Sequence, residues 1–76
     1  MLEYKNLIIS DPKIMLGKPT IKGTRITVVS ILKKMSEGAT IEDLKKLYPK
    51  LSEKEIMTCI EYAADVISNE EIMEVA

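Results

Sequence analysis

The chain has 76 residues, enough for one small domain, and such a domain buries only about 60% of its unfolded surface, so we expect a dimer or a bound partner to stabilise it. Apolar residues make up 46% and charged residues 30% of the sequence, with a net charge of -1, which excludes a disordered chain. One cysteine excludes an intrachain disulfide, and without a signal-peptide pattern or an apolar run of roughly 20 residues we expect a cytoplasmic protein with no membrane contact.

Two short apolar runs near the start of the chain predict strands. The run at residues 7–9 precedes Ser10, Asp11 and Pro12, and Pro12 disfavours helix at the residue before it, so this run is expected to enter a turn. The run at residues 14–16 is a second candidate strand, closed by Gly17. Residues 1–26 are therefore predicted to form a short N-terminal β arm or hairpin and a Gly/Pro loop, with the arm a candidate for pairing across a dimer axis.

The first helix is predicted at residues 28–37. Thr27 is a suitable N-cap, and Gly38 is placed to end the helix. Four apolar residues recur at the spacing of one helical face: Val28, Ile31, Leu32 and Met35.

Two further helices have clearer start signals. Thr40 and Asp43 resemble a capping box with Asp in the last position, and the short helix that follows is expected to stop at Tyr48 and Pro49. Its apolar stripe consists of Ile41, Leu44 and Leu47.

Ser52 and Glu55 form a full capping box for a third helix. The predicted apolar face of that helix consists of Ile56, Ile60, Ala63, Ala64 and Ile67.

The order of the elements predicts a mainly α fold, a three-helix helix-turn-helix domain with a short N-terminal β arm or hairpin. We expect residues 1–76 to form a single domain, in which residues 27–68 are the three-helix bundle and residues 69–76 an acidic tail. In a helix-turn-helix the third helix is the candidate reader of a DNA groove.

The net charge conceals an uneven distribution. Residues 1–50 carry ten cations and five anions, a net charge of +5, whereas residues 51–76 carry one cation and seven anions, a net charge of -6. The first part suits nucleic acid and the second a basic protein surface. The alternative is a solvated surface whose charge is uneven by chance.

The charges of the third helix leave two functions open. Candidate DNA contacts are Lys33, Lys34, Lys45, Lys46, Lys50, Lys54 and Thr58, with Tyr62 beside them. Against this, Glu53, Glu55 and Glu61 on the same helix would repel phosphate. A three-helix fold used for protein contact is the alternative, in which the third helix mainly packs or meets another protein.

The segment at residues 17–26, GKPTIKGTRI, is rich in turn formers and cations and buries little area, so its sequence is set by backbone geometry or by a partner. Its motif residues are Gly17, Pro19, Gly23, Thr24 and Arg25. We expect Gly17 and Gly23 to adopt backbone conformations that a side chain forbids, and Thr24 and Thr27 to bond to nearby backbone. Arg25 is expected to reach a phosphate or, as the favoured alternative, to pair with Asp11 or Asp43.

Four segments carry a resemblance to a known family: SDP at residues 10–12, GKPTIKGTRI at 17–26, GATIED at 38–43 and YPKLS at 48–52. Over residues 8–64 the chain resembles the small prokaryotic domain-of-unknown-function family 433. Members look like homeodomain-like or winged helix-turn-helix proteins, and many are regarded as antitoxins of type II toxin-antitoxin pairs. The resemblance implies a protein that binds and silences a PIN-like ribonuclease toxin, with repression of its own operon as a further expected activity.

The acidic tail is interpreted in that setting. PIN-like nucleases bind RNA with surrounding cations, so an acidic segment with apolar anchors suits the approach to their active site. The anchors would be Ile72, Met73 and Val75. The alternative is that the tail continues the third helix or frays. Two other classes of function stay open: a helix-turn-helix regulator without a toxin, and a dimerising adaptor.

The sequence argues against an enzyme, a cofactor, a metal site and a small-molecule substrate. Residues 17–20 lack the upstream glycine of a phosphate-binding loop, and Pro19 separates Lys18 from Thr20. There is no histidine, and Cys59 has no neighbouring base, so it is expected to be a small core residue. Glu70 and Glu71 are interpreted as a solvated face rather than a general acid and base.

Overall fold

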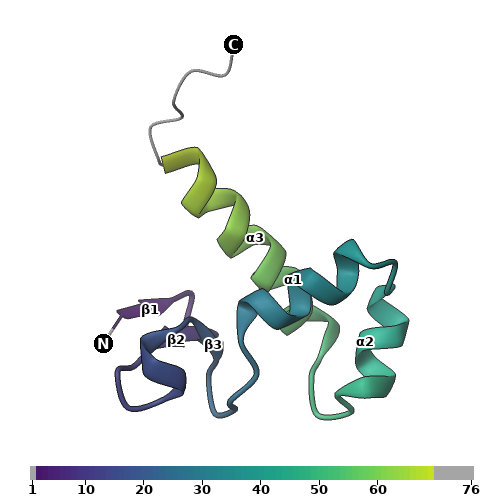
Figure 1. The fold of residues 1–76 in the computed structure, drawn as a ribbon, viewed down its shortest axis with the longest axis horizontal. Coiled ribbons are helices and arrows are strands. Elements are labelled where there is room, and N and C mark those ends of the chain that lie inside the picture. Colours follow the sequence, from purple (N-terminus) through teal and green to yellow (C-terminus); the bar gives the residue numbers. More distant parts are fainter. Residues whose placement is uncertain (1, 70–76) are drawn as a thin grey trace.

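A computed structural model describes residues 2–69 as three strands and three α-helices, with one short 3-10 helix between the second and third strands. The strands are β1 (Leu2–Tyr4), β2 (Ile8–Ser10) and β3 (Thr20–Ile21). The helices are η1 (Met15–Gly17), α1 (Val28–Ser36), α2 (Ile41–Leu47) and α3 (Glu53–Asn69). Figure 1 shows the strands at one end of the molecule, α2 at the other, and α3 projecting away from both.

The strands form one antiparallel sheet in the order β1-β2-β3, with Tyr4 opposite Ile8 and Ile8 opposite Ile21. The prediction of a mainly α domain with a β arm or hairpin is therefore wrong, because the domain is mixed α/β. The sheet is part of the core, since Ile8, Thr20 and Ile21 are all buried. An isolated antiparallel bridge between Thr20 and Thr27 also joins the sheet to the N-cap residue of α1.

The sequence analysis missed two strands, β1 and β3, and a tight turn at Lys5 and Asn6 explains the first of them. Both residues have positive φ, 51° and 61°, and the Leu7 N–H donates to the Tyr4 carbonyl at 3.0 Å. Two successive positive φ values match the backbone twist that antiparallel strands require of their connecting turn. Strand β1 is thereby folded back onto β2.

The second predicted strand, at residues 14–16, is not a strand. Met15 and Leu16 have φ of 50° and 59°, and the Gly17 N–H donates to the Ile14 carbonyl at 3.0 Å. The Asp11 carboxylate also accepts from the Lys13 N–H, which closes the preceding turn. The run has no room to extend between this turn and Gly17, so it coils into a 3-10 turn and Leu16 remains 91% exposed.

The predicted helix starts are confirmed. The Thr27 hydroxyl accepts from the Ser30 N–H at 3.1 Å, and the capping box of Thr40 and Asp43 has both of its hydrogen bonds. The Ser52 hydroxyl accepts from the Glu55 N–H at 3.1 Å, while the Glu55 carboxylate accepts from the Ser52 N–H at 2.8 Å. Each cap satisfies donors that the first turn leaves without a helical partner.

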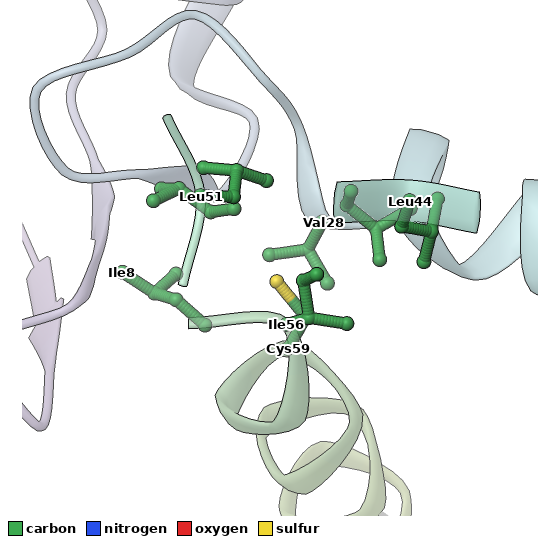
Figure 2. Close-up of a cluster of buried hydrophobic side chains, with 8 residues drawn as sticks. Ile8, Val28, Leu44, Leu51, Ile56 and Cys59 are labelled. Atoms are coloured by element: carbon green, nitrogen blue, oxygen red, sulfur yellow. The ribbon is translucent and has the colours of Figure 1, made fainter. Parts of the chain in front are cut away.

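The core lies where the sheet and all three helices meet. Figure 2 shows this cluster of aliphatic side chains, with the sulfur of Cys59 among them. The buried members are Ile8, Ile21, Val28, Ile31, Leu44, Leu51, Ile56 and Cys59. No aromatic side chain is among them, as expected for a chain without Phe or Trp.

The predicted apolar face of the third helix is only partly correct. Ile56 is buried, but Ala64 is exposed and Ile67 is 60% exposed. The reason is that α3 has 17 residues and extends past the core (Figure 1), so Ala64 and Ile67 lie beyond the buried cluster, whereas Tyr62 and Asp65 still contact Tyr4.

Candidate functional site: the motif groove

The GKPTIKGTRI segment forms β3 and the loop that leads into α1, and its hydrogen bonds are internal. The Thr24 hydroxyl donates to the Ile21 carbonyl at 2.7 Å and accepts from the Ile26 N–H at 3.0 Å. The Ile21 N–H in turn donates to the Ile26 carbonyl at 2.9 Å. Thr24 therefore holds the two sides of the loop together, and its predicted bonding to nearby backbone is confirmed.

The two glycines of the motif have the backbone conformations that were predicted. Gly17 has φ of 86° and Gly23 has φ of 82°, in the left-handed region that favours glycine. A Cβ at Gly23 would meet no atom within 4 Å, so the requirement there is conformational and not one of space. Pro19 contributes through its carbonyl, which accepts from the Val28 N–H at 2.9 Å and joins the segment to the first turn of α1.

The loop forms one wall of an open groove of about 510 Å³, which we call the motif groove. Ile26 lies on this wall, and the opposite wall consists of Leu47 at the end of α2 and of Tyr48 and Pro49 in the connection to α3. Leu47 is 54% exposed, so apolar surface is open to a partner. Arg25 and Lys50, both exposed, are the two cations that line the groove.

Arg25 does not make the ion pair that was favoured from the sequence. Within residues 2–69 the ion pairs are Lys5 with Glu61 and Lys22 with Glu3. The carboxylates proposed for Arg25 are used locally: Asp11 accepts from the Lys13 N–H, and Asp43 accepts from the Thr40 N–H, which lowers the pKa of Asp43. Both carboxylates expected to pair with Arg25 are therefore engaged within their own turns, and the ranking of an architectural role for Arg25 over a ligand contact stays a prediction.

Arg25 also lines a second hollow of about 430 Å³, together with Ile14, Gly23 and Thr24. Its guanidinium carries a fixed positive charge and can bind a carboxylate or a phosphate with two parallel hydrogen bonds. Arg25 lines both hollows, so it is the best placed anion-binding group of the motif.

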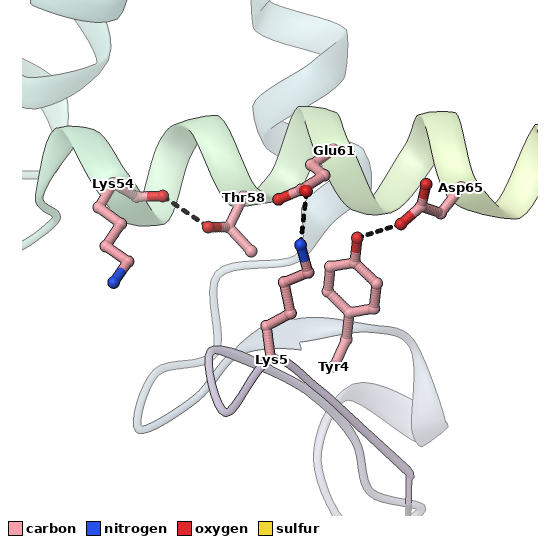
Figure 3. Close-up of polar contacts among 6 residues, drawn as sticks. All are labelled: Tyr4, Lys5, Lys54, Thr58, Glu61 and Asp65. Carbon is pink, nitrogen blue, oxygen red and sulfur yellow. Dashed lines mark hydrogen bonds and ion pairs between the residues drawn. The ribbon is translucent and has the colours of Figure 1, made fainter.

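Two acidic residues of α3 are engaged by the end of β1 and the turn that follows it, as Figure 3 shows. Lys5 pairs with Glu61 at 2.5 Å, and the Tyr4 hydroxyl donates to Asp65. The hydrogen bond to Glu61 raises the pKa of Lys5, and the hydrogen bond to Asp65 raises the pKa of Tyr4 to about 12. The sequence analysis missed Tyr4 and Lys5, because no local signal links residues about sixty positions apart.

The candidate DNA-contact residues fall into two places. Lys33 and Lys34 lie in the last turn of α1, whereas the other four lysines surround the connection between α2 and α3: Lys45, Lys46, Lys50 and Lys54. Lysines in a last helical turn also interact favourably with the helix dipole, which is a structural role. Glu55, one of the acids of α3 near this connection, accepts from the Ser52 N–H and keeps its negative charge.

Thr58 is withdrawn from the candidate DNA contacts. Its side chain is covered, with 5% exposure, and its hydroxyl donates to the Lys54 carbonyl at 2.7 Å (Figure 3). A hydroxyl used in this way, on a residue that solvent hardly reaches, is not available to a base edge or a phosphate.

Cys59 is a core residue, as predicted. It is fully buried, and burial raises the pKa of its thiol to about 11, with Glu55 adding a smaller effect. In the described part of the chain, no three His, Cys, Asp or Glu side chains are grouped to hold a metal ion. The predicted tail anchors Ile72, Met73 and Val75 lie outside the described residues.

Across residues 2–69, no helix combines the length and apolar character needed to span a membrane.

No match was found among curated proteins or among solved structures. A family model described as "Protein of unknown function (DUF433)" matches residues 8–63, a stretch that includes the whole motif segment and both walls of the motif groove. The chain therefore belongs to the DUF433 family.

Proposed function

We propose that this protein is the antitoxin of a type II toxin-antitoxin pair, which binds and neutralises a PIN-like ribonuclease in the cytoplasm. The family match supports this proposal only as far as membership, and the motif groove is the observation that carries it further. An exposed apolar groove lined by two cations fits an apolar segment of a protein partner that also carries carboxylates.

The residues of the groove suit a protein better than a small molecule. The groove is open to solvent, whereas a small ligand needs a site that encloses most of its surface. Arg25 and Leu47 provide the kind of charged and apolar contacts that carry binding energy in protein interfaces. A PIN-like nuclease, whose metal site is a cluster of acids, offers carboxylates to such cations.

The acidic tail gives the proposal a second contact. Residues 70–76 contain Glu70, Glu71 and Glu74 and no cation, so they complement the basic surface along which a ribonuclease binds RNA. The cations of the groove would therefore bind acidic groups of the toxin, and the acids of the tail would bind its basic groups. The groove would hold the toxin and the tail would block access of RNA.

The test is inhibition of the PIN-like nuclease encoded beside this gene, measured as RNA cleavage and as binding by calorimetry. Arg25→Glu and Lys50→Glu are expected to weaken binding by about tenfold or more, because each replaces an attraction with a repulsion. Lys13→Glu is the matched control, since Lys13 is exposed and lies outside the groove. Deletion of residues 69–76 is expected to weaken inhibition and leave the circular dichroism spectrum unchanged.

Three results would contradict the antitoxin proposal. The first is that no nuclease is encoded beside this gene. The second is unchanged inhibition by both groove variants. The third is equal weakening by Lys13→Glu, which would indicate a general charge effect instead of a contact at the motif groove.

A second candidate function is DNA binding, and the four lysines around the connection between α2 and α3 favour it. If they contact phosphates, affinity for the upstream DNA falls steeply with salt, with a slope of about 0.9 per phosphate contact. Replacement of Lys46 and Lys50 by Gln is then expected to reduce that slope in a mobility-shift series. An unchanged slope would remove these lysines from any DNA interface.

A further inference from the structure

The turn formed by η1, residues 15–17, has a backbone conformation that side chains disfavour. Met15, Leu16 and Gly17 have successive positive φ values of 50°, 59° and 86°. Two hydrogen bonds close the turn: the Gly17 N–H donates to the Ile14 carbonyl at 3.0 Å, and the Lys18 N–H donates to the Met15 carbonyl at 3.1 Å. A Cβ crowds the backbone in this left-handed region, and only the third residue is a glycine. The first two positions are therefore strained.

Burial does not offset the strain at Leu16. Its side chain is 91% exposed, and it belongs neither to the core cluster nor to the apolar residues packed against that cluster. Glycine or asparagine would adopt the same backbone conformation at lower cost. Strained backbone of this kind is concentrated at binding sites and ligand clamps. Leu16 is therefore a candidate contact residue.

The η1 turn adjoins the hollow that Arg25 lines together with Ile14, Gly23 and Thr24. Leu16 follows Ile14 by two positions, so their Cα atoms are separated by no more than about 7.6 Å. Among the described residues, Arg25 is the one charged group that lines this hollow, and it forms no ion pair within residues 2–69. An exposed apolar side chain and an available cation are thus presented close together.

We propose that Leu16 inserts into an apolar pocket of the toxin, and that Arg25 binds a carboxylate at the rim of that pocket. This inference rests on the proposed function, and it adds to the motif groove a second contact that shares Arg25 with it. A cation beside an apolar group is complementary to an apolar pocket with an acid at its edge. The closed turn holds Leu16 in place before the toxin binds, so little conformational freedom is lost on binding.

A second copy of this chain fits the surface around Leu16 less well than the toxin does. The motif groove of a second copy is lined by Arg25 and Lys50, which would repel the exposed Lys18 beside the turn. The hollow of about 240 Å³ between β1 and α3 includes Glu3, but Lys22 of the same chain already pairs with that carboxylate at 3.3 Å. Neither hollow offers an acid without a partner.

An anionic membrane is also a weaker candidate. Such a surface attracts cations, and an exposed leucine can enter its outer layer. However, even a complete myristoyl chain gives only marginal membrane binding, and a leucine side chain is much smaller. A protein pocket that encloses Leu16 and pairs with Arg25 uses both groups and is the occupant that the charges favour.

The experiment measures binding of the full chain to the PIN-like nuclease encoded beside this gene, by calorimetry. Leu16→Asn removes the apolar side chain at a position where asparagine tolerates the backbone, and it is expected to weaken binding by about tenfold or more. It is also expected to raise the melting temperature, because it relieves strain and removes no buried group. A variant that is more stable and binds more weakly cannot owe its weaker binding to a damaged fold.

Three matched variants test whether the apolar side chain itself is required. Leu16→Met keeps an apolar side chain of similar volume and is expected to retain most of the affinity. Met15→Asn makes the same change at the neighbouring left-handed residue, which is 40% exposed, and is expected to raise the melting temperature with little change in binding. Lys13→Glu remains the charge control, since Lys13 lines neither hollow.

Failure of this inference can be told apart from failure of the proposed function. If Arg25→Glu weakens binding and Leu16→Asn does not, the antitoxin function stands and Leu16 is not an anchor. If the wild-type chain does not bind the nuclease, the antitoxin function fails, and the toxin contact at Leu16 fails with it.

Further results would overturn the inference for other reasons. A lower melting temperature of Leu16→Asn would show that Leu16 packs against the fold. Equal weakening by Leu16→Met and Leu16→Asn would show that the loss does not depend on apolar character. If Leu16→Asn keeps the nuclease but loses binding to vesicles of phosphatidylcholine and phosphatidylserine, the occupant is a membrane. If it keeps the nuclease but lowers the mass in sedimentation equilibrium, the occupant is a second copy.

Discussion

Lys5 and Glu61 are separated by 56 residues in sequence, and in the structure their Nζ and Oε2 atoms lie 2.5 Å apart. Both side chains are about half exposed, 53% and 49%, so solvent screens the pair and the attraction itself adds little stability. Its importance is positional, since it marks the place where the turn between β1 and β2 meets α3. The neighbouring Tyr4 packs edge-on against Tyr62, with ring centroids 5.1 Å apart.

The packing of Tyr4 is expected to hold this contact more firmly than its hydroxyl does. Tyr4→Phe keeps the ring against Tyr62 and loses only the hydrogen bond to Asp65, whereas Tyr4→Ala loses both. Tyr4→Ala should therefore lower the melting temperature more than Tyr4→Phe, and more than Lys5→Ala. Equal effects of the Phe and Ala variants in calorimetry would show that the hydroxyl dominates.

The hydrogen bond between Tyr4 and Asp65 should make stability depend on alkaline pH. The pKa of Tyr4 is raised from 10.0 to about 12 in the folded protein, so its contribution is fully present below pH 10 and is lost as the pH rises toward 12. The difference in denaturant midpoint between wild type and Tyr4→Phe is expected to shrink over this range. A constant difference up to pH 12 would contradict the assignment.

The N-caps of α2 and α3 should each contribute to stability. Thr40→Ala and Ser52→Ala are each expected to lower the free energy of unfolding by about 1 kcal/mol, because each leaves first-turn N–H groups without their acceptor. Ser36→Ala is the control, since the exposed Ser36 hydroxyl bonds only to the Lys33 carbonyl, and its effect should stay within about 0.5 kcal/mol. Urea unfolding measures all three.

The conformation of Gly23 should be costly to impose on another residue. Gly23→Ala is expected to destabilise the fold by about 1 to 2 kcal/mol through backbone strain at φ of 82°, since a Cβ there meets no other atom within 4 Å. Gly23→Asn should cost less, because Asn tolerates left-handed backbone better than Ala. If Ala and Asn cost the same in urea unfolding, strain is not the cause.

The thiol of Cys59 should be unreactive in the folded protein. A pKa raised from 9.0 to about 11 lowers the thiolate fraction near neutral pH by about 100-fold, and burial also blocks the reagent. Labelling by a thiol reagent is therefore expected to follow global unfolding and to accelerate with urea. Rapid labelling in the absence of denaturant would show that α3 opens locally.

The features that could be predicted from sequence are those decided within three or four residues. The caps at Thr27, Thr40 and Ser52, the positive φ of Gly17 and Gly23 and the bonding of Thr24 all follow from short-range geometry. The groove was not predicted, because its walls at Arg25 and Tyr48 are far apart in sequence. The expected pairing of Arg25 with Asp11 or Asp43 was wrong because each carboxylate is used by its own turn.

The sequence by itself determined the family, the three helices and the aliphatic core, because motif spacing, capping residues and apolar periodicity act locally. Only the tertiary structure decided that a sheet shares that core, that Lys5 and Tyr4 engage Glu61 and Asp65, and that Ile67 stays exposed. The physical reason is that an apolar stripe in the sequence indicates which side chains of a helix can be buried. The position and length of the neighbouring elements decide how many of those side chains are buried. On α3 the two differ, since Ile56 is buried and Ile67 is 60% exposed.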